Sequence, residues 1–315
     1  MTLERETAAR WVFALMAGIH LAGSLKAQPP MPVSATGIVF AADVPLVELN
    51  GVPCVEVRIG DGSPVLFGVD TGNVNTLIDT KIAKSAGLAL EGLPPPAPAG
   101  FYLTSIPPIH IGPVVIGGRR GVALDFSANQ LPAGIAGTLA YTVFKDRIVQ
   151  MDFAAGRLRI SDILTGPVSI PGPRDSLSLI RFGRNGPPIV VAQGFELEGK
   201  PVSAQVDTMY TGSMLIYSAS LAKLGLESSA NTSATEFFPL TDGGVKMKVA
   251  EARSESFHGT PLGAGRLKVY FPTLGVHEPD GLFDATVGIA LLGDAVLTLD
   301  FHDSTISVSK GSLSG

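Results

Sequence analysis

The sequence contains little cysteine, little charge and few aromatic residues. One cysteine occurs among 315 residues, while charged residues make up 16% and aromatic residues 7%. The lone Cys54 excludes an internal disulfide and a cysteine-rich zinc site. Its apolar neighbours favour a small buried residue in a strand over a reactive thiol. The sequence therefore argues against a disulfide-rich or zinc-stabilised fold.

The chain also lacks the motifs of several common enzyme classes. It has no Gly-x-Ser-x-Gly elbow and no phosphate-binding glycine-rich loop that ends in Lys-Ser or Lys-Thr. The five histidines form no metal-binding pair at helical spacing; they are His20, His110, His258, His277 and His302. These absences argue against a zinc hydrolase, an elbow-type serine hydrolase and a P-loop nucleotidase. We expect no metal and no cofactor.

Charge and composition favour a β-rich protein without a nucleic-acid partner. The net charge is −5, and no run of basic residues is present of the kind that phosphate binding requires. The 37 glycines and 24 prolines indicate many turns, and 45% hydrophobic residues permit a substantial core. We therefore predict an all-β fold, β-rich with short helices.

The N-terminal residues 1–27 are predicted to form a signal peptide. The apolar run from Trp11 to Leu25 follows Arg5 and Arg10, and it is too short to span a bilayer comfortably. Because acidic residues dilute the positive charge before the run, a frayed N-terminal helix is the alternative. We expect an exported protein, periplasmic or extracellular, with no stable membrane span.

A short motif with chemical potential occurs twice in the chain. In each copy an apolar run ends in an aspartate followed by a threonine, as expected where a buried strand presents an acid at its end. The copies are Val69-Asp70-Thr71-Gly72 and Val206-Asp207-Thr208-Met209. One such turn alone is often structural, because Asp, Thr and Gly are ordinary turn formers. The apolar frame and the repetition favour one site built from two halves.

The surroundings of the motif are repeated as well. Each copy precedes a short helix that ends in Gly-Leu, and later a hairpin that carries Asp-Phe, at Asp152-Phe153 and Asp300-Phe301. This order indicates an internal duplication. We place the two units at residues 35–162 and 176–310, joined by a linker rich in proline and glycine at 163–175. The acids of the hairpins are interpreted as structural, and Asp79 as a helix cap.

Two carboxyl groups that face each other across a cleft cannot both ionise, and they share one proton. The ionised member can accept a proton from a bound water while the protonated member donates to a substrate carbonyl. Thr71 and Thr208 could each hydrogen-bond the backbone of the opposite half, and Gly72 would let a backbone N–H approach the carboxylate closely. Such a pair hydrolyses an amide without a metal.

With these features the chain resembles the pepsin- and retropepsin-like aspartic proteases, most closely the bacterial two-lobed aspartyl protease family proteins. The resemblance covers about residues 35–310. It implies two β-barrel lobes related by a pseudo-twofold axis, a monomer, and an endopeptidase acting on a peptide or unfolded protein. The matching residues, beyond the Asp-Thr and Asp-Phe pairs, are Gly87-Leu88 and Ile135-Ala136-Gly137 in the first lobe, and Gly225-Leu226 and Val287-Gly288 in the second.

The resemblance implies roles for individual residues. Asp70 and Asp207 would be catalytic, supported by Thr71, Gly72, Asn73 and Thr208. Tyr102, in a proline-rich segment predicted to cover the site, would close over the substrate; its alternative role is to anchor that loop. Met209 and Tyr210 are further candidates for substrate binding.

The sequence departs from the family pattern at two positions. Asn73 stands where a small residue is usual, and Met209 replaces the glycine of the second turn, which is also one residue longer. If that position requires a positive φ, Met209 is strained; if it requires only close approach, Met209 walls the cleft. The alternative to an active protease is therefore a catalytically impaired protease-like fold that binds peptides or proteins.

Overall fold

The protein is β-rich with short helices, as predicted, and its strands form two sheets. Among the described residues no helix has the length and apolar character needed to cross a membrane. The predicted signal peptide and parts of the predicted linker and proline-rich loop lie outside the described residues. The computed structural model describes residues 38–93, 100–129, 131–166, 170, 173–181, 188–238, 245–263, 267–273, 278–279 and 281–310.

A sheet of ten strands is formed by residues of the first half of the chain (residues 38–166). Its hydrogen-bonded order is β6-β7-β10-β5-β11-β4-β3-β8-β9, and β2 pairs with β3. Helix α2 (Thr80–Ser85) follows β5. The strands are β2 (Val47–Leu49), β3 (Val52–Ile59), β4 (Val65–Asp70), β5 (Leu77–Asp79), β6 (Glu91–Gly92), β7 (Phe101–Ile106), β8 (Ile109–Ile111), β9 (Val114–Ile116), β10 (Arg119–Leu124) and β11 (Gly137–Ala140).

The second sheet has fifteen strands and includes all strands of the second half (residues 173–310). Three first-half strands also belong to it: β1 (Phe40–Pro45), β12 (Ile148–Asp152) and β13 (Arg157–Ser161). The others are β14 (Asp175–Arg181), β15 (Pro188–Leu197), β16 (Lys200–Val206), β17 (Met214–Ile216), β18 (Ala234–Phe238), β19 (Val245–Ala252), β20 (Glu255–Phe257), β21 (Thr260–Pro261), β22 (Leu267–Phe271), β23 (Ala285–Val287), β24 (Ala295–Asp300) and β25 (Thr305–Lys310).

The helices of both halves are short. The first half also has a 3-10 turn, η1 (Tyr141–Phe144), after β11. In the second half they are η2 (Ser218–Ser220), α3 (Leu221–Leu224), α4 (Glu227–Thr232) and α5 (Ile289–Leu292).

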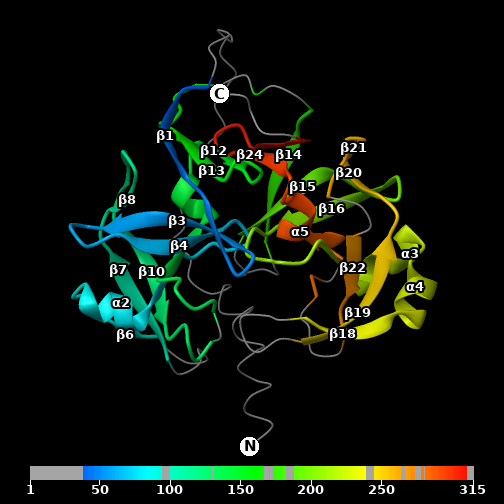
Figure 1. The fold of residues 1–315 in the computed structure, drawn as a ribbon, viewed down its shortest axis with the longest axis horizontal. Helices are drawn as coiled ribbons and strands as arrows, with labels where there is room; N and C mark the ends of the chain where they lie inside the picture. Colours follow the sequence, from blue (N-terminus) through cyan, green and yellow to red (C-terminus); the bar gives the residue numbers. More distant parts are fainter. Residues whose placement is uncertain are drawn as a thin grey trace, which may run out of the picture.

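The strand order of the first half recurs in the second. The series β6-β7-β10-β5-β11-β4-β3 has its counterpart in β18-β19-β22-β17-β23-β16-β15. In both series the strand that ends at an Asp-Thr turn pairs in parallel with a later strand, β4 with β11 and β16 with β23. The duplication predicted from the sequence is therefore present in the strand order. In Figure 1 the first-half strands β3, β4 and β7 lie on one side of the molecule, and β18, β19 and β22 lie on the other.

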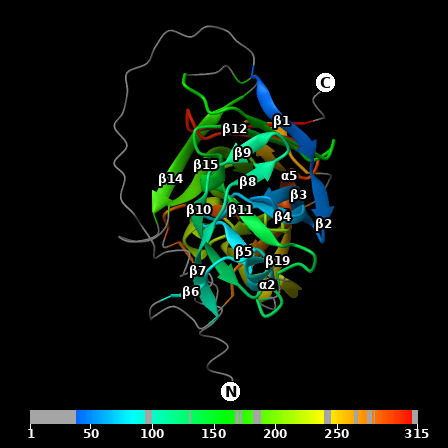
Figure 2. The ribbon, with the colours of Figure 1, turned by 90° about the vertical axis from the view of Figure 1, so that its left-hand side faces the viewer.

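The two halves are joined through the antiparallel pair β12 and β24. Gln150 faces Thr298 at the middle of this pair, and its Nε2 donates to Thr298 Oγ1 at 3.1 Å. Buried residues of both halves, such as Met151 and Leu297, belong to one continuous apolar core. Figure 2 views the first-half strands from their own side, with β19 and α5 behind them.

Several turns adopt the backbone that their residues predict. Asn50 and Gly51 have φ values of 53° and 80°, which suit the tight turn between β2 and β3. Gly87 and Gly225 have φ values of 69° and 65° at the ends of the short helices. Asp79 caps α2, because its Oδ1 accepts the N–H of Lys81 at 2.7 Å. Cys54 is fully buried in β3, as predicted.

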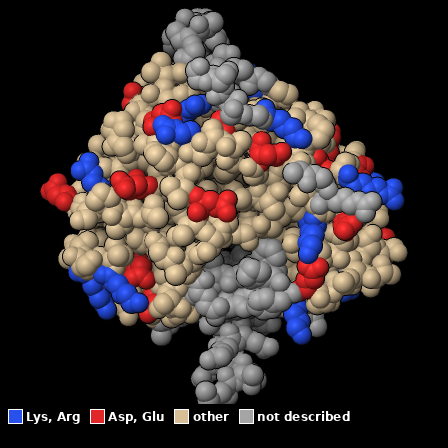
Figure 3. Space-filling model, in the orientation of Figure 1, with Lys and Arg blue, Asp and Glu red and all other residues tan. Residues whose placement is uncertain are grey.

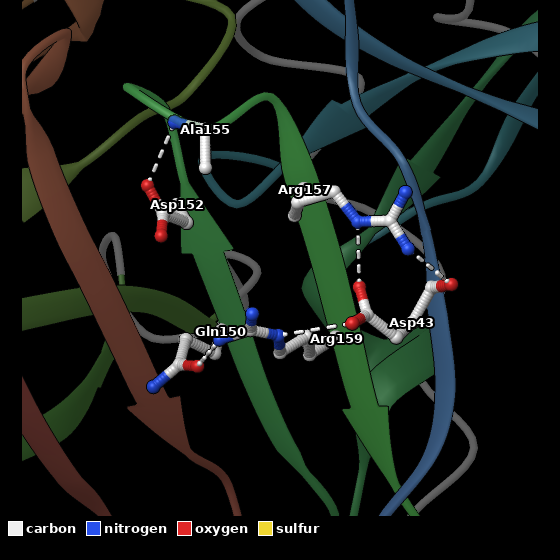
Figure 4. Close-up of polar contacts among 6 residues, drawn as sticks. All are labelled: Asp43, Gln150, Asp152, Ala155, Arg157 and Arg159. Atoms are coloured by element: carbon white, nitrogen blue, oxygen red, sulfur yellow. Dashed lines mark hydrogen bonds and ion pairs between the residues drawn. The ribbon is translucent and has the colours of Figure 1, made fainter. Parts of the chain in front are cut away.

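The two Asp-Phe hairpins use their acids for structure. Asp152 Oδ1 accepts the N–H of Ala155 at 2.9 Å within the hairpin between β12 and β13, as Figure 4 shows. Asp300 Oδ1 accepts the N–H groups of His302 and Asp303, each at 2.9 Å. Each acid stabilises its own turn, which agrees with the structural role predicted for both.

On the face in Figure 3, acidic and basic side chains are interspersed.

Candidate functional site

Asp70 and Asp207 stand at equivalent ends of two equivalent strands. Asp70 is the last residue of β4 and is only 6% exposed, and Asp207 directly follows β16. Both acids directly follow a fully buried valine, Val69 or Val206, and Asp207 is half-buried. An acid in this setting is desolvated, which favours its protonated form.

Thr71 and Thr208 connect the two turns with a symmetric set of hydrogen bonds. The N–H of Thr71 donates to Thr208 Oγ1 and the N–H of Thr208 donates to Thr71 Oγ1, both at 3.1 Å. Thr71 Oγ1 donates to the carbonyl of Val206 at 2.8 Å, and Thr208 Oγ1 donates to that of Val69. Both threonines are fully buried. The hydrogen bonds predicted from each threonine to the opposite half are present. They fix the two Asp-Thr turns relative to each other.

Gly72 is required for close approach and not for an unusual backbone angle. A Cβ atom on Gly72 would lie 2.4 Å from Asp207 Cγ and within 2.8 Å of both carboxylate oxygens. Gly72 is not among the residues with positive φ. The Asp207 carboxyl group therefore packs directly on the Gly72 backbone, and any side chain here would displace it.

Met209 occupies the equivalent position of the second turn without strain. It has no positive φ, which answers the first of the two possibilities raised by the sequence. Its side chain crosses to the first half and lies over Gly68, where a Cβ atom would be 2.7 Å from Met209 Sδ. There it packs against a buried cluster that includes Cys54 and Leu124. The missing side chain of Gly68 makes room for Met209.

The two acids have raised pKa values with different balances of causes. Burial raises the pKa of Asp70 well above its usual range, and the nearby Asp207 carboxylate raises it further, while Asn73, Thr138 and the Gly72 N–H oppose the shift in part. Burial also raises the pKa of Asp207.

Two backbone donors favour the charged form of Asp207. Asp207 Oδ1 accepts the N–H groups of Met209 at 2.9 Å and Tyr210 at 3.2 Å, and these donors oppose the rise of its pKa. The arrangement favours one proton shared by the pair.

The register of β11 and β23 corrects one match made from the sequence. Ala140 pairs with Asp70, and Val287, just before Gly288, pairs with Val206. The residue equivalent to Gly288 is therefore Ala140 and not Gly137. The repeated glycine misled the comparison, because it lies three residues before the equivalent position.

The register also confirms the extra residue of the second turn. Leu77 pairs with Thr138 and Leu215 with Thr286, so the second turn reaches its next strand one residue later. The N–H of Tyr141 donates to Asn73 and that of Ile289 donates to Tyr210. The extra residue therefore follows Tyr210.

The predicted substrate-binding residues lie in different surroundings. Tyr102, in β7, is half-buried and packs against the main core, whereas its neighbour Phe101 packs against the same cluster as Met209. The alternation of side chains along a strand could have indicated this difference. Tyr210 is 8% exposed and packs in a second-half cluster with Val191. The binding roles of Tyr102, Met209 and Tyr210 remain predictions.

Sequence reasoning missed two polar residues beside the acids. Thr138 in β11 faces Asp70 and lowers its pKa. Gln205 in β16 donates from Nε2 to the carbonyl of Gly72 at 3.1 Å. Gln205 stands two residues before Asp207, and Gly68 stands two residues before Asp70. This difference between the two motifs is the signal in the sequence that could have indicated Gln205.

Within the part of the chain that the structure describes, no three His, Cys, Asp or Glu side chains are placed to hold a metal ion. No protein-family model matches the sequence, and no curated protein shows significant similarity to it. The chemistry of the site therefore has to be argued from its own geometry.

Proposed function

We propose that this protein is a two-lobed aspartic endopeptidase in which Asp70 and Asp207 activate a water molecule. The observation that carries the proposal is the carboxyl pair of buried Asp70 and half-buried Asp207, whose turns are joined by reciprocal hydrogen bonds between Thr71 and Thr208. Burial and mutual repulsion favour one proton on the pair, which is the state needed to supply a base and an acid together.

The pairing of the central strands supports a pseudo-twofold relation between the lobes. Ile148 pairs with Asp300 and Asp152 with Val296 across β12 and β24. Val149 pairs with Ile160 in the first half, as Leu297 pairs with Val308 in the second. An axis through the middle of β12 and β24 would exchange these pairs and would bring the two Asp-Thr turns together.

The proposed reaction uses Asp207 as the base and Asp70 as the acid. Asp207 accepts a proton from water as the water oxygen attacks the peptide carbonyl carbon, and Asp70 donates its proton to the carbonyl oxygen. Asp207 then passes its proton to the departing nitrogen as the carbon–nitrogen bond breaks, and Asp70 recovers a proton from the tetrahedral intermediate. The N–H groups of Met209 and Tyr210 favour ionised Asp207 at the start.

The proposed substrate is a peptide or an unfolded protein, met outside the cytoplasm if residues 1–27 direct export. The alternative function is peptide binding without cleavage. Met209, which stands in place of the glycine of the second turn, is the residue that motivates this alternative.

The test is digestion of a peptide library from acid to neutral pH with wild type, Asp70→Asn and Asp207→Asn. We expect cleavage by wild type and a loss of at least about a thousandfold in both variants, because each removes one role of the pair. Absence of cleavage by wild type, or cleavage that persists in Asp70→Asn, would overturn the proposal. A pepstatin-type inhibitor separates the alternative: a competent pair binds it and loses binding in Asp207→Asn.

A further inference from the structure

Gly72 is the residue that touches both carboxyl groups of the site. Its N–H lowers the pKa of Asp70, and its backbone packs against the Asp207 carboxylate. Its carbonyl oxygen accepts a hydrogen bond from Gln205, which belongs to the other half of the chain. A side chain of the second half therefore holds the turn of the first.

The Gln205 amide is held by the hydroxyl of Thr286, which in turn contacts the hydroxyl of Tyr217. Thr286 Oγ1 donates to Gln205 Oε1 at 3.4 Å, and the Tyr217 hydroxyl lies 2.8 Å from Thr286 Oγ1. Thr286 and Tyr217 are 5% and 6% exposed. Because Oε1 faces Thr286 and Nε2 faces Gly72, the amide has one orientation, and the chain of contacts ends at the Gly72 carbonyl.

The first half lacks this device. Gly68 occupies the position of Gln205, since Thr138 pairs with Gly68 as Thr286 pairs with Gln205. The space over Gly68 is filled by Met209 from the second turn. Thr138 Oγ1, the counterpart of Thr286 Oγ1, faces Asp70 and not a glutamine amide. In both contacts a long side chain of the second half lies against a glycine of the first, Gln205 against Gly72 and Met209 against Gly68. The second half therefore supplies the side chain of both contacts.

We propose that Gln205 is a positioning residue for the two acids. Held by Thr286 and Tyr217, it fixes the Gly72 peptide, and through Gly72 it fixes Asp70 and Asp207 relative to each other. The contact between Met209 and Gly68 cannot replace Gln205, because Gly68 has no side chain and the Met209 side chain has no amide that could donate a hydrogen bond. The activity readout of this inference rests on the proposed function, whereas the titration of the acids does not.

The test replaces Gln205 with methionine, which keeps the length and removes the amide. In Gln205→Met we expect kcat to fall about tenfold with KM unchanged, because the lost hydrogen bond positions the acids and does not touch substrate. We also expect the basic limb of the pH profile, which reports loss of the proton from Asp70, to move up by about half a unit, because the Gly72 N–H that favours the charged form of Asp70 is no longer held in place. Gln193→Met makes the same change on the exposed side of β15 and should leave both quantities unchanged.

The hydroxyl of Thr286 provides a second variant of the same relay. Thr286→Val should act in the same direction as Gln205→Met, and the double variant should be no worse than the more severe single one, because both break one chain of contacts. Thr286→Ser keeps the hydroxyl and should restore the wild-type pH profile. A purely structural role would instead lower stability in all these variants without moving the profile.

The carboxyl titration is measured separately by carbon NMR on protein labelled at aspartate, with signals assigned through Asp70→Asn and Asp207→Asn. A shifted titration in Gln205→Met supports the inference even if wild type cleaves nothing, in which case only the proposed function fails. An unchanged titration in Gln205→Met overturns the inference, whatever the activity of wild type.

Discussion

Glu255 shows how one residue can make the stability of this protein depend on pH. It is 3% exposed in β20, and neither carboxyl oxygen has a hydrogen-bond partner at ordinary geometry. Glu255 pairs with Leu197 in the second half, and Ile109 pairs with Ile59 at the equivalent place in the first half. Glu255 is therefore an acid at a position where the first half has an isoleucine. Burial raises the pKa of Glu255 from 4.5 to about 8.

We predict that Glu255→Leu stabilises the protein increasingly as the pH rises from 4.5 to about 8. In this window the folded wild type keeps a proton that the unfolded chain releases, so its stability falls by about 1.4 kcal/mol for each pH unit. Below the window both states are protonated and this contribution is constant. Urea unfolding of both proteins at several pH values measures the difference.

Two controls accompany this measurement. Glu255→Gln also removes the titration but keeps a buried polar group, so it should be less stable than Glu255→Leu at every pH. Glu56→Gln makes the same change at an exposed position of β3 and should leave the pH dependence unchanged. A constant difference between Glu255→Leu and wild type across the window would contradict the prediction.

Gly68 and Met209 should be energetically coupled, because the second fills the space that the first leaves. We expect Gly68→Ala to destabilise wild type by about 1–3 kcal/mol, since the new Cβ would lie 2.7 Å from Met209 Sδ. In a Met209→Ala background the same change should cost much less. A double-mutant cycle by urea unfolding gives the coupling free energy. Gly92→Ala, with open space around its Cβ, is the matched control, and additive costs would refute the coupling.

The acids and threonines of the candidate site could be predicted because each belongs to a motif that occurs twice. Asp70, Asp207 and the two threonines are recognisable from local sequence. Gln205 is not, because a glutamine in a strand carries no distinctive pattern and its partner, Gly72, lies in the other half. A contact between halves depends on how they pack, which local sequence does not specify.

Among the elements, turns and short helices could be predicted and the arrangement of outer strands could not. The φ values of Asn50 and Gly51 follow from their chemistry. The pairing of β1 with β13, more than a hundred residues away in sequence, has no local signal. It depends on the surface that the folded halves present together.

The pairing of β1 with β13 is reinforced by one acid between two arginines, as Figure 4 shows. Asp43 Oδ1 lies 2.8 Å from Arg157 Nε, and Asp43 Oδ2 lies 3.3 Å from Arg159 Nε. Slight burial opposes the effect, but hydrogen bonds from both arginines hold the pKa of Asp43 below its usual value of 3.8. Because the Asp43 side chain is 44% exposed, solvent screens these attractions strongly.

We therefore predict a small cost of about 0.5–1 kcal/mol for Asp43→Asn at neutral pH and low salt. The contribution of Asp43 is present above pH 3.8 and is lost as the pH falls through its lower folded-state pKa. The cost should also shrink in high salt. Thermal unfolding at low and high salt measures it, with the exposed turn variant Asp61→Asn as control. A cost that is insensitive to both salt and acid would show that the ion pairs do not contribute.

At the scale of the whole molecule, the candidate site depends on contacts between the halves, because each half contributes only one of the two acids, Asp70 or Asp207. Five residue pairs join β12 to β24, and the reciprocal hydrogen bonds of Thr71 and Thr208 lie beside the acids. The same apolar core contains Met151 from one half and Leu297 from the other. Separation of the halves would expose this surface and leave the edge of β12 unpaired, which favours self-association.

We predict that the protein survives a cut in the chain between Gly166 and Asp175. With a specific protease site inserted there, the two pieces should migrate as one species on size exclusion and should keep the proposed peptide cleavage, because the joining contacts lie elsewhere. The isolated first piece should self-associate and be inactive, and mixing with the second piece should restore cleavage.

Thr208→Val should weaken the association of the cut pieces, because it removes hydrogen bonds between the halves. Separation of the pieces under native conditions, or cleavage by one piece alone, would show that the site is not shared between the halves.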